Sequence, residues 1–137
     1  MIIYIDENLS TQLAEGLNKL QQPLNKKNGT DFSILSIKKE FGEGAKDEDW
    51  IPAAGNQGAI AITRDFKIQT TRHQFALCKE HNLGLFFLKD TSSHFGYWQM
   101  VQSIVNHWEE ILSTIQKNSP PYAFRFSSRT KLENISS

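Results

Sequence analysis

Three carboxylates, Asp6, Asp47 and Asp65, stand where a strand or a loop meets the next element of the chain. Asp6 directly follows an apolar run at 2–5, and Asp65 closely follows a second apolar run at 59–63. In an open parallel sheet the carboxyl ends of the strands meet at one edge, where ligand crevices form. Acids gathered there repel one another unless a cation joins them, and magnesium or manganese is the usual ion for an all-oxygen site. The sequence therefore predicts a divalent-cation site at this edge.

Each acid also has a simpler interpretation. Asp6 could cap the helix that follows it, Asp65 could pair with Arg64 at the surface, and Asp47 could be an ordinary solvated loop acid. The joint pattern favours the metal site, because positioning a cation and its water needs two or more carboxylates on rigid elements. The role of Asp47 depends on the helix start beside it. With Asp49 as the N-cap, Pro52 falls in the first turn and Asp47 stays available, whereas with Asp47 as the N-cap Pro52 removes a helical hydrogen bond.

The elements that must position these acids alternate along the chain. Apolar runs predict strands at 2–5, 32–37, 59–63 and 85–88. Helical spacing predicts helices over 9–20, capped by Asn8 or Ser10, and over 47–57, 70–81 and 95–117. Breakers and charges predict loops at 23–30 and 38–46, and the tail 120–137 is expected to be extended in its first part or partly disordered. This order predicts an α/β fold, a single domain over 1–137 with a mainly parallel central sheet of about four strands flanked by helices.

Composition narrows the classes of function. The 137 residues carry no net charge, so any attraction to nucleic acid must come from a local patch or a metal. A single cysteine, Cys78, excludes an internal disulfide and is expected to be a buried thiol, and the four histidines lack zinc-site spacing. The sequence has no run long enough to cross a membrane and no secretion signal at its start, so we expect a cytoplasmic protein.

Several separated pieces of the sequence resemble one family. YIDENLSTQLAEGL, then GAKDEDWIPAAGNQGAIAITRDFKI, then LGLFFL are similar to PIN-like domains of VapC-type toxins, in a divergent branch with a DEN…D..W…G…IT.D pattern. The resemblance covers about residues 2–90. It implies a ribonuclease dependent on Mg²⁺ or Mn²⁺, usually the toxin of a toxin–antitoxin pair. Matching the motif makes Asp6, Asp47 and Asp65 the catalytic and metal-binding residues, and Asp90 is the candidate for a fourth acid.

Polar residues beside the predicted site are candidates for binding substrate. They are Asn8, Thr63, Arg64 and Lys67, and ordinary surface roles are the alternative. Arg64 and Lys67 could contact RNA phosphates, and Thr63 could steady a carboxylate or a phosphate. A non-catalytic PIN-like module that binds RNA or a protein is the alternative function. A phosphotransfer receiver domain is disfavoured, because no fifth strand ending in lysine precedes the long helix.

The apolar stripe of the predicted helix 95–117 does not use all the aromatic residues near the end of the chain. Phe95, Trp98, Tyr122, Phe124 and Phe126 could form a contact surface for an antitoxin or for a second copy in a homodimer. The alternative is that they cover the second face of the sheet.

Overall fold

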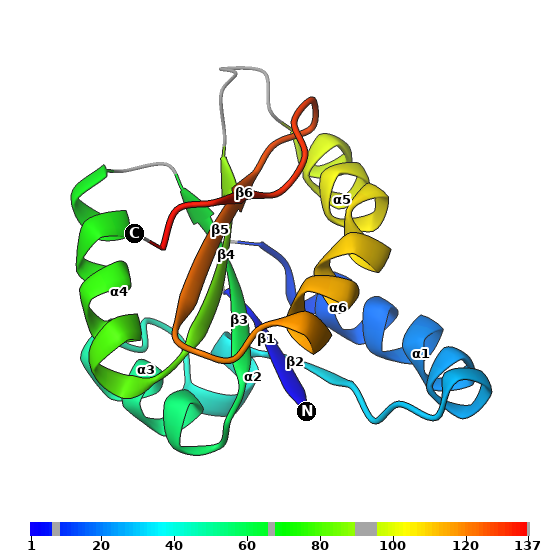
Figure 1. The fold of residues 1–137 in the computed structure, drawn as a ribbon, viewed down its shortest axis with the longest axis horizontal. Helices are drawn as coiled ribbons and strands as arrows, with labels where there is room; N and C mark the ends of the chain where they lie inside the picture. Colours follow the sequence, from blue (N-terminus) through cyan, green and yellow to red (C-terminus); the bar gives the residue numbers. More distant parts are fainter. Residues whose placement is uncertain (7–8, 66–67, 90–95, 137) are drawn as a thin grey trace.

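A computed structural model describes residues 1–6, 9–65, 68–89 and 96–136, with the side chains of 65 and 68–70 left undescribed. A sheet stands between two layers of helices, as Figure 1 shows. The described residues form six strands in the order β2-β1-β3-β4-β5-β6, of which the first five run parallel and β6 runs antiparallel to β5. The predicted α/β class with a mainly parallel sheet is confirmed.

The strands lie close to their predicted positions. Their bounds are β1 Ile2–Ile5, β2 Ser33–Ser36, β3 Ile60–Asp65, β4 Gly84–Lys89, β5 Tyr122–Phe126 and β6 Glu133–Asn134. The extended segment expected early in the tail is β5, which pairs with β4 along its length. Two more strands than expected therefore extend the sheet beyond β4.

The helices divide between the two faces of the sheet. Their bounds are α1 Thr11–Asn28, α2 Ile37–Phe41, α3 Asp47–Asn56, α4 Ile68–His81, α5 Tyr97–Asn106 and α6 Trp108–Lys117. Buried residues of α1, α5 and α6 share one core with Ile3, Ile62 and Phe86. Buried residues of α2, α3 and α4 share the other core with Tyr4 and Phe87. We call the first the α1 face and the second the α4 face.

The last crossover of the sheet differs in hand from the others. The steps from β3 to β4 and from β4 to β5 run in the same direction across the sheet. The first passes through α4 on the α4 face, but the second passes through α5 and α6 on the α1 face. Two such steps with helices on opposite faces have opposite hands, whereas parallel crossovers are nearly always right-handed. The last third of the chain therefore packs beside α1.

Helix α1 is longer than its sequence predicts, and the expected loop at 23–30 is wrong for most of its length. The helix continues through Pro23 to Asn28, and Gly29 ends it in the left-handed conformation with φ 66°. Asn25 explains the continuation, because its amide donates to the Phe32 carbonyl at 2.8 Å and its Oδ1 accepts from the Phe32 N–H at 3.3 Å. These bonds satisfy backbone groups beside the edge strand β2, which offsets the helical bond that proline cannot make.

We expect Asn25→Ala to destabilise the protein by about 1–3 kcal/mol, because the Phe32 N–H loses its bond to Asn25 and the Phe32 carbonyl keeps only the longer bond from Gln22. Urea unfolding followed by circular dichroism measures this change. Asn28→Ala, an exposed change on the same helix, is the matched control and should stay within about 0.5 kcal/mol of wild type. Equal stability of both variants would contradict the assigned role of Asn25.

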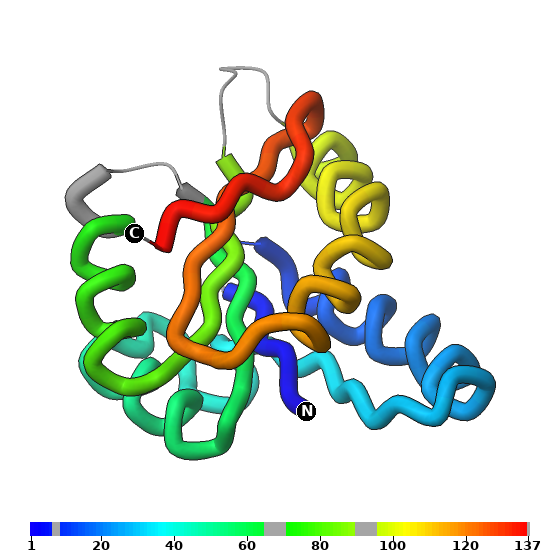
Figure 2. Tube along the Cα trace, viewed as in Figure 1, coloured from blue at the N-terminus to red at the C-terminus, as the bar shows by residue number. Residues whose placement is uncertain are grey.

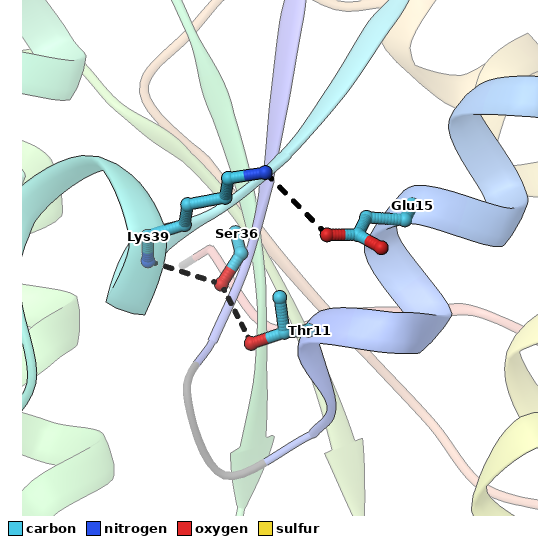
Figure 3. A network of polar contacts seen from close by, with 4 residues as sticks. All are labelled: Thr11, Glu15, Ser36 and Lys39. Atoms are coloured by element: carbon cyan, nitrogen blue, oxygen red, sulfur yellow. Dashed lines mark hydrogen bonds and ion pairs between the residues drawn. The ribbon is translucent and has the colours of Figure 1, made fainter.

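A polar network joins the first turns of α1 and α2 beside the end of β2, as Figure 3 shows. The Ser36 hydroxyl accepts from the Lys39 N–H at 3.3 Å and lies 3.5 Å from the Thr11 hydroxyl. Lys39 reaches across to Glu15 on α1 at 3.5 Å. Ser36 is thus the N-cap of α2, a short helix within the region predicted as loop. The network fixes both helices to the carboxyl end of β2.

The predicted long helix over 95–117 is two helices with a break at His107, and residue 95 lies outside the described residues. The aromatic residues of β5 are buried: Tyr122, Phe124 and Phe126 cover the α1 face of the sheet. Their predicted role in a contact surface is therefore wrong. Trp98 remains 69% exposed on α5.

The tail after β5 passes from one face of the sheet to the other. Leu132 packs against the core of the α1 face, and Ile135 packs against that of the α4 face. Figure 2 shows this segment crossing the end of β5 to finish beside α4. The tail therefore covers the open side of β5.

Candidate functional site

The carboxyl edge of the sheet has its switch point between β1 and β3. These strands are neighbours, yet β1 leads to α1 on one face and β3 leads to α4 on the other. Ligands of open α/β sheets bind outside the strand ends at such a point. In Figure 1 this edge is at the top of the sheet. The three predicted acids belong to the elements that meet here.

Asp47 is held firmly at this edge. It is the first residue of α3, whose N-cap is Lys46 without a side-chain cap bond. Neither Asp49 nor Asp47 is therefore the N-cap, and Pro52 lies inside the helix. Asp47 Oδ1 accepts from the Trp50 indole N–H at 3.0 Å and from Gln74 Nε2 at 3.4 Å. Neither described bond uses Oδ2. A carboxylate fixed through one oxygen presents the other in a defined direction.

Gln74 connects Asp47 to the sheet. Gln74 is 5% exposed on α4, and its Oε1 accepts from the Thr63 hydroxyl of β3 at 3.4 Å. Both distances are longer than those of a typical hydrogen bond, so each contact of this amide is weak. The contact chain Thr63–Gln74–Asp47 crosses from β3 through α4 to α3. It places Asp47 on the α4 face, level with the end of β3.

Asp6 approaches the same place from β1. Its N–H donates to the Ile62 carbonyl at 3.0 Å, which continues the ladder one residue beyond Ile5 and brings Asp6 level with Thr63. Side chains alternate between the faces of a strand, so position 6 shares the α4 face with Tyr4. Asp6 is half-buried. The structure thus brings Asp6 and Asp47 to one face at one edge.

Other predicted site residues are placed less completely. Asp65 is the last residue of β3, two positions after Thr63, and its side chain lies outside the described residues. Asn8, Lys67 and Asp90 lie wholly outside them. The remaining two candidates are described. Thr63 is fully buried and meets Gln74, while Arg64 is half-buried and, by strand alternation, on the opposite face.

The donor set suits a hard divalent cation. Asp6 and Asp47 offer carboxylate oxygens from rigid positions, and the strand position of Asp65 would add a third. Among the described residues no group of three or more histidine, cysteine, aspartate or glutamate side chains forms a metal cluster. Asp6 and Asp47 are two acids, and a metal site of three acids would need Asp65, whose side chain lies outside the described residues.

The first turn of α3 also meets α4 at the surface. Glu48 Oε1 lies 2.5 Å from His73 Nε2, one residue before Gln74. A hydrogen bond from its own backbone N–H, followed by that from His73, holds the pKa of the Glu48 carboxyl below its ordinary value. Further along, Gly55 of α3 packs so closely on α4 that a Cβ there would lie 2.0 Å from the His81 carbonyl oxygen. The contacts of Asp47 with Gln74 and of Glu48 with His73 thus align α3 with α4.

Sequence reasoning missed Gln74, although a signal was present. Thr71, Gln74 and Cys78 recur at helical spacing on the buried side of α4. A glutamine on a buried helical face needs hydrogen-bond partners, which here are Thr63 and Asp47.

An open α/β sheet with aspartates at its switch point defines a class of domains that bind ligands at the carboxyl edge. The chain matches the PIN-like domain family over residues 1–90 and belongs to that family. PIN-like domains are often nucleases and generally use divalent metals. Comparisons with curated proteins and with solved structures found no match. No helix among the described residues is long and apolar enough to cross a membrane.

Cys78 lies apart from this edge, on the buried side of α4. Burial raises the pKa of its thiol to about 12, and the thiol donates to the Leu83 carbonyl. Because the thiolate is the reactive form, we expect Ellman's reagent at pH 8 to leave native protein unlabelled and to label one thiol in urea. Rapid labelling of the native protein would contradict the burial of Cys78.

Proposed function

We propose that this protein is a divalent-metal-dependent endoribonuclease whose site is formed by Asp6, Asp47 and Asp65. The contact chain Thr63–Gln74–Asp47 carries the proposal, because it ties the acid of α3 to the strand that ends in Asp65. Asp6 is level with Thr63 on the neighbouring strand. Three carboxylates on rigid elements at a switch point are what a phosphodiester-cleaving metal site requires.

The chain's own residues would divide the work. A bound Mg²⁺ or Mn²⁺ supplies Lewis-acid chemistry, activating water and neutralising charge on the phosphate. Asp6, Asp47 and Asp65 would hold the ion. Trp50 and Gln74 keep Asp47 Oδ1 occupied, so that Oδ2 faces the site in one orientation. Thr63 acts from within the core, through Gln74, and not by direct contact with RNA.

Substrate contact is assigned to cationic and amide groups around the edge. Lys67 and Asn8 are the proposed phosphate contacts, whereas Arg64 is left out because it is half-buried on the opposite face of β3. The metal adds positive charge that the neutral chain lacks. Single-stranded RNA is the proposed substrate, in the cytoplasm. The non-catalytic alternative predicts RNA binding without cleavage, so a cleavage assay separates the two.

The test is cleavage of single-stranded RNA by purified protein. We expect cleavage with Mg²⁺ or Mn²⁺ and none after EDTA, with activity restored by excess metal. Gel analysis of a labelled oligonucleotide gives the rate. Cleavage at full rate in EDTA would rule out the metal mechanism, and RNA binding without cleavage in either metal would favour the binding module.

We further propose that the protein is the toxin of a type II toxin–antitoxin pair, in the VapC-like branch. The exposed residues Tyr97, Trp98 and Val105 support a protein contact on α5, since aromatic residues are enriched at interfaces. Co-expression with the product of the neighbouring reading frame tests this. The proposal requires a complex that suppresses RNA cleavage, and Trp98→Ala should weaken it. Light scattering of the free protein decides whether α5 serves a homodimer instead.

A further inference from the structure

We infer that Gln74 is a positioning residue of the metal site, which sets the direction in which Asp47 presents its second carboxylate oxygen. The inference rests on the proposed function, because it concerns the same site. It extends the site to α4, a helix to which the sequence assigned no role in it. The basis is the place of Gln74 between the Asp47 carboxylate and the Thr63 hydroxyl.

The two neighbours of Gln74 determine how its amide is oriented. Asp47 in its charged form can only accept, so the side-chain group that meets Oδ1 must be the Nε2 donor. Thr63 lies on the other side and donates its hydroxyl to Oε1 at 3.4 Å. An amide satisfies both neighbours at once. A carboxylate at position 74 would set two negative oxygens against each other, and an apolar side chain would satisfy neither.

Burial protects the contacts of Gln74 from exchange with water. Gln74 is 5% exposed and Thr63 is fully buried, so water has little access to replace either bond. Asp47 Oδ1 then has two donors, the Trp50 indole from its own helix and the Gln74 amide from α4. The indole fixes Asp47 relative to α3, whereas among the contacts of the described residues Gln74 is the link between Asp47 and β3. Asp6 follows β1 and Asp65 ends β3, so both are positioned by the sheet. The position of Asp47 relative to these two acids therefore depends on its contact with Gln74.

The experiment measures Mn²⁺ affinity by the electron paramagnetic resonance signal of the free ion, without any substrate. Gln74→Met keeps the approximate size of the side chain but removes both polar groups. Gln74→Glu keeps the shape but replaces the Nε2 donor with an oxygen that accepts. We expect both to weaken Mn²⁺ binding about 10- to 100-fold, the usual loss for groups that orient metal ligands. Thr63→Val should weaken it in the same direction but less. Gln102→Glu, the same chemical change at an exposed position of α5, should leave the affinity unchanged.

A double-mutant cycle separates positioning from a general effect on folding. If Gln74 acts through Asp47, Gln74→Met should have little further effect on residual affinity when Asp47→Asn is already present. Equal loss in both backgrounds would overturn the inference. The melting temperature of each metal-free variant shows whether it folds. If Gln74→Met does not fold, Gln74→Glu replaces it in the cycle.

The outcomes distinguish this inference from the proposed function. Wild-type protein that binds no Mn²⁺ overturns both. Wild-type binding that Asp47→Asn weakens, with Gln74 variants unchanged, overturns the role of Gln74 alone. Tighter binding by Gln74→Glu also overturns it, because position 74 would then supply a ligand directly.

Discussion

Asp47→Asn is expected to lower the rate of metal-dependent RNA cleavage by about 10³-fold, equivalent to about 4 kcal/mol of transition-state stabilisation. Asparagine retains the oxygen that accepts from Trp50 and Gln74, but replaces the second carboxylate oxygen with a donor. The fold should therefore persist while the metal ligand is lost. Single-turnover cleavage of labelled RNA at saturating Mn²⁺ measures the effect. Asp6→Asn and Asp65→Asn should behave similarly, with melting temperatures equal to or above wild type because clustered acids repel without metal.

Asp49→Asn is the matched control for this series. Asp49 is exposed in the same first turn of α3 and carries the same charge, but none of its described contacts involves the site. Its rate should stay within about twofold of wild type. If Asp49→Asn and Asp47→Asn lose activity equally, net charge at the helix start, and not a ligand at position 47, determines the rate.

Gly55→Ala is expected to destabilise the protein by about 3 kcal/mol or more and to lower the melting temperature by roughly 10 °C. The new Cβ would lie 2.0 Å from the His81 carbonyl oxygen and 3.1 Å from its carbon. Backbone atoms cannot turn aside as a flexible side chain can, so α3 must move away from α4. Scanning calorimetry measures the loss. Because that contact also aligns Asp47 with Gln74, Mn²⁺ affinity should fall in the variant under conditions where it remains folded.

Gly16→Ala provides the comparison, since it makes the same substitution inside a helix that has room for it. Apart from its chain neighbours and the adjacent backbone of its own helix, no atom of the described residues lies within 4 Å of a Cβ at Gly16. Alanine restricts the unfolded chain and favours the helix, so a gain of about 0.5–1 kcal/mol is expected. A similar loss in both glycine variants would show that close packing at Gly55 is not the cause.

The strands were predictable because their signal is local. Each of β1 to β4 is a short apolar run between breakers, and burial on both faces explains why those runs are nearly continuous. The long α1 was not predictable from local signals. Pro23 and Gly29 are typical of a loop, whereas the helix is joined to the neighbouring segment by bonds such as those of Asn25 to Phe32, which no local pattern predicts. Likewise, the excess of aromatic residues could not reveal that β5 would bury Tyr122 and Phe124 on the α1 face.

The carboxylates of the candidate site were predictable from the sequence, but the residues that hold them in place were not. Asp6 and Asp65 follow strand signals directly, and the arrangement of parallel strands brings such positions together. Asp47 depends on where α3 starts and which face it covers, which no periodicity determines. Gln74 reaches Asp47 across 27 residues of sequence, and such a contact exists only after α3 and α4 have packed.

The reversed hand of the last crossover has a consequence for synthesis on the ribosome. All three proposed metal ligands lie within the first 65 residues, and the family match ends at residue 90. The core on the α1 face, however, also requires Ile104, Ile111 and Phe126. A nascent chain that has exposed every acid of the site would still have one side of its sheet open to water, and would be prone to aggregate there. We therefore expect the acids to be held in a fixed arrangement only after the segment through Phe126 has also left the exit tunnel and covered that face.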